Sequence, residues 1–150
     1  SGNQELWVAL AEKAYAQVNE SGRIGQDGTN FYGNGNDNGI GWGSSSEATR
    51  QITGIASSSQ SIAAYSQASL INLVASSRVV TIGGFNALAT DSNAGPTQIS
   101  TAVQGHAYAI TGYDAASSRF SIYNPWGSRH LSLTYNQLLA LGGVISASAS

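Results

Sequence analysis

The chain has 150 residues, the size of one compact domain, and 41% of them are hydrophobic. Only 9% are charged and the formal net charge is -2, which excludes the broad positive surface that nucleic-acid binding requires. The sequence contains no cysteine, so these residues hold no disulfide, no thiolate zinc site and no cysteine nucleophile. No apolar run is long enough to span a bilayer.

The N-terminal part of the sequence predicts a helix followed by a long loop. Apolar residues recur with helical spacing over 3–20, and Gly22 stands just beyond the end. The predicted apolar stripe consists of Leu6, Trp7, Leu10, Ala11, Ala14 and Val18. Residues 21–43 are dense in Gly and Asn and lack an apolar period, which indicates a loop.

Helices are predicted next, and strands after them. The helices are expected at about 45–53 and at 61–76, and from residue 78 the apolar period becomes that of strands. The β-rich runs are 78–85, 106–113 and 119–124, with shorter candidates at 131–133 and 144–147 and a helical turn over 135–140. A run of helices followed by a run of strands is typical of an α+β domain.

Most motifs of known chemistry are missing. The sequence has no phosphate-binding GxxxxGK[ST], no Gly-x-Ser-x-Gly and no HExxH, and it contains two histidines in all. We therefore predict neither a metal site nor a cofactor. The stretch 105–127, GHAYAITGYDAASSRFSIYNPWG, remains as the candidate functional segment.

Residues 105–127 read as two strands joined by a turn at 114–118. With the turn centred near Ala116, Tyr113 lies opposite Arg119 and Tyr108 opposite Asn124, so that His106 and Asn124 are diagonal neighbours on one face. A register slip of one residue places them on opposite faces. An Asn oxygen that accepts from a His ring fixes the tautomer of that His. The alternative is that His106 is structural and that Asn-Pro-Trp-Gly is a plain turn.

Three ordered segments of this sequence resemble those of calpain-like cysteine peptidases of the papain superfamily. GHAYAIT and YNPWG resemble the family's His and Asn segments, LWVALAEKAYA at 6–16 resembles its LWVALLEKAYA helix, and Gly43-Ser44-Ser45-Ser46-Glu47 resembles its Gly-Ser-x-Ser-Glu stretch. The resemblance implies a papain-like α+β fold. Residues 1–43 would be the end of the helical subdomain and its loop, and 44–150 the antiparallel β-rich subdomain.

The resemblance also implies roles for individual residues. His106 would be the general base and acid that activates a thiol, Asn124 would orient it, and Trp126 would cover their hydrogen bond. Gly43 would bond to an extended peptide substrate, and Gly105 would line the site. The family's calcium site, which follows the catalytic Asn in animal calpains, needs acidic ligands, whereas residues 125–150 contain no Asp or Glu.

The nucleophilic Cys of such peptidases lies upstream of the LWVALLEKAYA helix, and this chain has none. Our first hypothesis is the His- and Asn-bearing half of a cysteine endopeptidase, acting on peptides or proteins with a partner segment or chain that carries the Cys. The alternatives are a pseudoenzyme that holds peptides in the groove, and an extracellular module that binds glycans through Phe31, Tyr32 and Trp42. A Ser-, Gly- and Asn-rich composition with one lysine favours an extracellular or cell-surface location.

Overall fold

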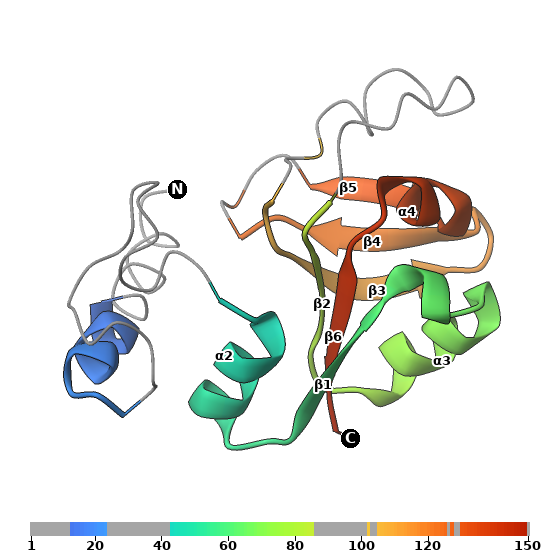
Figure 1. The fold of residues 1–150 in the computed structure, drawn as a ribbon. Coiled ribbons are helices and arrows are strands. Elements are labelled where there is room, and N and C mark those ends of the chain that lie inside the picture. The colour runs from blue at the N-terminus through green and yellow to red at the C-terminus, as the bar shows by residue number, and fades with distance from the viewer. Residues whose placement is uncertain are drawn as a thin grey trace. The chain divides into compact units, whose positions relative to one another are not determined.

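The structure is a computed structural model that describes residues 13–23, 43–85, 102, 105–125, 127 and 130–149. The chain divides into two compact units, Ser1–Ser44 and Ser45–Ser150. The order of elements in the second unit is helical first and then mainly β, as an α+β domain requires (Figure 1). No helix among the described residues is long and apolar enough to cross a membrane.

In the first unit, residues 13–20 are helical, and Gly22 lies just beyond the end of the helix, as predicted. Gly22 has φ of +75°, and its N–H donates to the Asn19 carbonyl at 2.8 Å. The apolar stripe is wrong over this part, since Ala14 and Val18 are exposed whereas Ala16 and Asn19 are buried. The buried side is thus rotated from the predicted stripe, which was set mainly by residues 6–11. Those residues, and 24–42 of the expected loop, lie outside the described residues.

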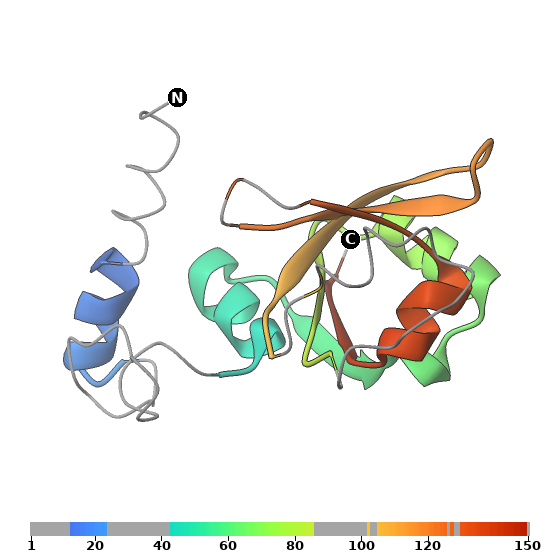
Figure 2. The same ribbon diagram turned by 90° about the horizontal axis from the view of Figure 1, so that it is seen from above.

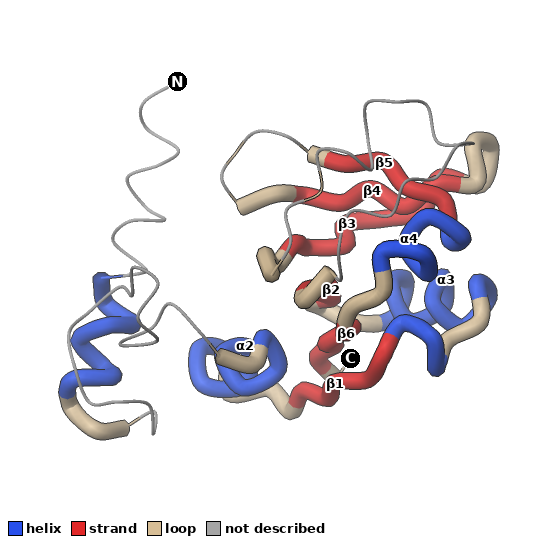
Figure 3. The backbone as a smooth tube through the Cα atoms, turned by 45° about the horizontal axis from the view of Figure 1, so that its top comes forward, coloured by secondary structure: helices blue, strands red, loops and turns tan. Residues whose placement is uncertain are grey.

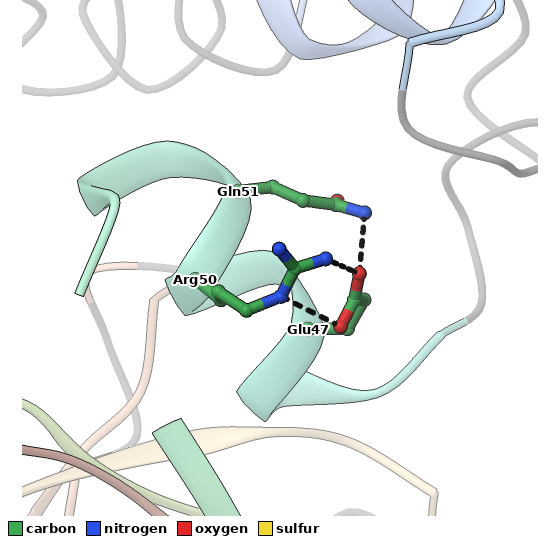
Figure 4. A network of polar contacts seen from close by, with 3 residues as sticks. All are labelled: Glu47, Arg50 and Gln51. Carbon is green, nitrogen blue, oxygen red and sulfur yellow. Dashed lines mark hydrogen bonds and ion pairs between the residues drawn. The ribbon is translucent and has the colours of Figure 1, made fainter. Parts of the chain in front are cut away.

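The second unit opens with helix α2, Ser45–Thr53, which confirms the predicted helix at 45–53. Glu47 and Arg50 are one turn apart, so their side chains meet on the helix surface (Figure 4). The Glu47 carboxylate accepts from Arg50 Nε at 3.2 Å and from Gln51 Nε2 at 3.0 Å. The Arg50 hydrogen bond is the main cause that holds the pKa of Glu47 below its ordinary value.

The prediction of one helix over 61–76 is wrong at its N-terminal end. Ser57–Ser61 form strand β1, Ile62–Ala64 a 3₁₀ turn η1, and only Gln67–Ser76 the helix α3. The interruption has a local cause, because the Ser66 side chain accepts from the Ser69 N–H at 3.1 Å and caps a new helix start. β1 was missed since its sequence, SSSQS, has no strand propensity of its own.

The remaining predicted elements are confirmed with shifts of a few residues. They are the strands β2 (Val80–Gly83), β3 (Tyr108–Asp114), β4 (Arg119–Tyr123), β5 (Leu131–Thr134) and β6 (Val144–Ser148), and the helix α4 (Tyr135–Leu141). The described strands make one six-stranded sheet in the order β1-β6-β2-β3-β4-β5, and every pairing is antiparallel (Figure 3).

The sheet has helices on both sides. α3 packs against β3 and α4 against β5, whereas α2 packs against β1 and β6, and Figure 2 shows α2 on the side opposite α3 and α4. The main core lies between the sheet and α3 and α4, where alternate strand residues point inward. Its largest fully buried apolar side chains are Tyr108, Phe120, Ile62, Leu70, Ile82, Ile122, Leu133, Leu138, Leu141 and Ile145.

Candidate active site

The two candidate residues lie at the same end of the β3–β4 hairpin. His106 comes two residues before β3 begins, and Asn124 directly follows the last residue of β4. His106 Nε2 lies 3.0 Å from Asn124 Oδ1, a normal hydrogen-bond distance. Asn124 is fully buried and His106 is partly buried. The predicted relation between these two side chains is therefore found.

A β-bulge decides this relation. At the turn end of the hairpin, Asp114 pairs with Arg119 and Tyr113 with Phe120, so the predicted pairing of Tyr113 with Arg119 is wrong by one residue. The register then shifts between Ile110 and Gly112. Beyond the shift Ala109 pairs with Tyr123, which is the register predicted for the site end.

This shift decides on which face of the sheet His106 lies, because the pairing at the turn end of the hairpin differs by one residue from the pairing at the end that carries the site. Continued without the bulge, the pairing of Asp114 with Arg119 would put His106 and Asn124 on opposite faces of the sheet. The extra residue in β3 is Thr111, whose hydroxyl donates to the Ser121 carbonyl at 3.2 Å. The bulge thus brings His106 onto the face of Asn124.

The turn itself is held by its own side chains. Asp114 accepts hydrogen bonds from the Ala116 N–H at 3.0 Å and from the Ser117 hydroxyl, and Ser118 adopts φ of +55°. The Ser117 bond, followed by the Ala116 bond, holds the pKa of Asp114 below its ordinary value. A turn of this kind fixes the register from which the bulge then departs.

Two aromatic rings support the imidazole from the core. The His106 ring meets the Tyr108 ring edge-on, with centroids 4.8 Å apart and an interplanar angle of 86°. Tyr108 in turn lies against Phe85, with centroids 5.4 Å apart. Both supporting side chains are almost fully buried. The Tyr108 contact restricts the rotation of the His106 ring, and Phe85 packs behind Tyr108.

The supporting role of Tyr108 and Phe85 was not predicted. The alternation in HAYAI places Tyr108 on the His106 face, and this signal was available in the sequence. Phe85 lies more than 20 positions earlier, and no local pattern connects it with His106.

The bond to Asn124 determines the chemistry that His106 can perform. An amide oxygen only accepts hydrogen bonds, so the imidazole donates from Nε2 and carries its proton there. Nδ1 is then the basic nitrogen, and it can take a proton from an acidic partner group. A neutral His held in one tautomer by an amide is suited to activating a nucleophile.

A comparison with protein-family models matches residues 1–137 to the calpain family of cysteine proteases. The match covers well over half of the 150 residues. The chain belongs to the calpain family of cysteine proteases. A search of the curated proteins found no match.

The calpain-family match extends over both units and includes all five residues named from the resemblance. Gly105 directly precedes His106, is exposed, and has φ of +69°, a conformation that favours glycine. Gly43 has φ of 153° and belongs to the first unit, so its expected bond to a substrate stays a prediction. Trp126 lies outside the described residues, and its expected cover over the His106–Asn124 bond also stays a prediction.

Within the described part of the chain, no three or more His, Asp or Glu side chains group so that they could hold a metal ion.

We expect this chain to bind no calcium tightly, because calcium needs six to eight oxygen ligands and residues 125–150 supply no carboxylate side chain. The check is a calorimetric titration of calcium into chelator-treated protein. One site with micromolar affinity would contradict the prediction and direct attention to Asp27 and Asp37.

Proposed function

We propose that this chain is the His- and Asn-bearing part of a calpain-like cysteine endopeptidase, which hydrolyses peptide bonds in peptide or protein substrates. The observation that carries the proposal is the 3.0 Å contact between His106 Nε2 and Asn124 Oδ1 within a calpain-family chain. The papain-like arrangement, with residues 1–43 ending the helical subdomain and 44–150 forming the β-rich one, is part of the same proposal.

The nucleophile in this proposal is a cysteine supplied by a segment outside these 150 residues, which contain none. His106 takes the thiol proton at Nδ1, and the resulting thiolate attacks the scissile carbonyl carbon. His106 then returns the proton to the leaving amine, and in the second half-reaction it deprotonates the water that releases the acyl group. Asn124 keeps the ring in the required orientation throughout.

Reconstitution tests this function. The chain alone is expected to show no thiol-dependent cleavage of casein, whereas addition of an upstream Cys-bearing segment is expected to produce cleavage that iodoacetamide abolishes. The same segment with its Cys changed to Ala is the control. Cleavage by the chain alone that His106→Ala leaves unchanged would refute the site. Intact-mass analysis of the native sample further tests whether a second, Cys-containing chain accompanies this one.

The second candidate function is a domain that holds peptides without cleaving them, and an upstream segment in which another residue replaces the Cys would favour it. It predicts saturable binding of unfolded peptides by the chain alone and no cleavage with any Cys-bearing segment. Phe31, Tyr32 and Trp42, on which the glycan-binding alternative rests, lie outside the described residues. The extracellular or cell-surface location stays a proposal on composition alone.

A further inference from the structure

Both histidines of the chain contact Asn124, although only His106 has a role in the proposed function. His106 Nε2 lies 3.0 Å from the Asn124 side-chain oxygen. The Asn124 backbone N–H donates to Nδ1 of His130 at 3.1 Å. The second contact joins residues six apart across the connection between β4 and β5, and it was not predicted from the sequence.

The His130 bond meets a need of the backbone at this point. β4 pairs with β5 as far as Ile122 and Leu131, so Asn124 lies beyond the last paired residues. Asn124 is fully buried, and a buried backbone N–H without a partner is unfavourable, so this N–H needs an acceptor. His130 Nδ1 takes the place that a strand carbonyl would otherwise occupy.

The His130 ring is itself held in place. Extending the pairing of Ile122 with Leu131 by one step puts His130 opposite Tyr123, and the two rings stack with centroids 4.4 Å apart and an interplanar angle of 21°. His130 is exposed, so its contact with Tyr123 and Asn124 is made at the surface of the protein. The side chain is thus oriented by an aromatic neighbour and aims a ring nitrogen at a buried donor.

The acceptor role requires a defined state of His130. A ring nitrogen accepts a hydrogen bond only when it carries no proton, so the contact requires the His130 tautomer with its proton at Nε2. Gly127 N–H donates to the Asn124 carbonyl at 3.0 Å, and the backbone of Asn124 is therefore bonded at both its N–H and its carbonyl. Because the side chain of Asn124 is attached to this backbone, a displaced backbone would move the oxygen that accepts from His106 Nε2.

We propose that His130 is a positioning residue of the active site, which fixes the backbone of Asn124 and through it the tautomer of His106. One part of the inference rests on the proposed function, namely that His106 is the catalytic base. The contacts themselves, and the experiment below, concern the chain whether or not it cleaves peptides.

The experiment uses the full 150-residue chain and three substitutions at residue 130. His130→Asn places an amide oxygen near the position of Nδ1, His130→Gln places the same group one carbon further out, and His130→Phe keeps the stacking on Tyr123 without an acceptor. In each variant His106 is the last remaining histidine, because the chain has two. Its ring nitrogens can then be followed by nitrogen-15 NMR without overlap.

We expect His106 to be predominantly the Nε2–H tautomer in the wild type and in His130→Asn, and a mixture of both tautomers in His130→Gln and His130→Phe. The Asn124 backbone N–H is expected to exchange about fivefold faster in the last two, the loss of one ordinary hydrogen bond. Thermal unfolding of all four proteins separates these local effects from a loss of the fold.

Three results would overturn the inference. The first is an unchanged His106 tautomer in every variant. The second is the same mixture of His106 tautomers in His130→Asn as in His130→Gln, which would mean that the position of the acceptor has no effect. The third is unfolding of the Gln and Phe variants together with an altered tautomer in a folded His130→Asn. None of these results depends on cleavage, so failure of the inference is distinguishable from failure of the proposed peptidase function.

Discussion

In a reconstituted enzyme, His106→Ala is expected to lower kcat/KM by about 10²–10⁴-fold, the usual worth of a positioned proton transfer. Asn124→Ala should cost less, roughly tenfold, because it removes a hydrogen bond of ordinary strength and moves no proton itself. The measurement is the steady-state cleavage of a peptide substrate at saturating Cys-bearing segment. Both rates are compared with that of the unsubstituted chain.

A matched control is available in Asn136→Ala, which removes the same amide group from an exposed position on α4. It should leave the rate unchanged. Since Asn124 is fully buried, the Tm of each variant is measured in parallel, so that a loss of fold is not counted as a loss of orientation. Small and equal effects of the His106 and Asn124 substitutions in folded protein would eliminate the pair as catalytic machinery.

Gly143→Ala is expected to destabilise the fold by roughly 2–4 kcal/mol, through strain at a positive φ together with overpacking. Gly143 lies between α4 and β6 with φ of +106°, and a Cβ built there would be 2.6 Å from the Gly83 carbonyl oxygen. That oxygen belongs to the backbone of β2 and cannot rotate away. The new Cβ would also lie 3.5 Å from the Phe85 ring, which supports Tyr108 and so the His106 ring.

Gly84→Ala is the control for this experiment, because Gly84 also has a positive φ of 69° but nothing lies within 4 Å of an added Cβ. Its cost should be about 1–2 kcal/mol, the conformational part alone. Both values come from urea unfolding at equilibrium. If the two variants lose the same stability, the close approach between Gly143 and Gly83 contributes nothing.

The sequence predicts the helices and strands well where a local signal exists. α2, α4 and the strands from β2 to β6 were located to within a few residues, because their hydrophobic periods, turns and caps are local properties. β1 was missed for the opposite reason. Its five polar residues become a strand only by pairing with β6, from Ser57 with Ser148 to Ser61 with Val144, across more than 80 positions.

For the candidate site too, some features were predictable from local sequence and others were not. The types and the order of its residues, in GHAYAIT and YNPWG, are local properties of the sequence, and they resemble the calpain family, to which the chain belongs. The contact between His106 and Asn124 depended on a register that the sequence left open. The predicted turn register was off by one residue, and the bulge at Thr111 restored the predicted relation at the site.

The sequence by itself therefore determined the α+β class, the family and the identity of the two facing residues. The tertiary structure alone decided that these residues face each other, that Phe85 packs against Tyr108 behind the imidazole, and that His130 bonds to Asn124. The physical reason is that strand register and ring contacts are set by the sum of many pairings distant in sequence. A single extra residue in β3 changes which face a side chain occupies, and no pattern within one strand reveals which of its residues stays unpaired.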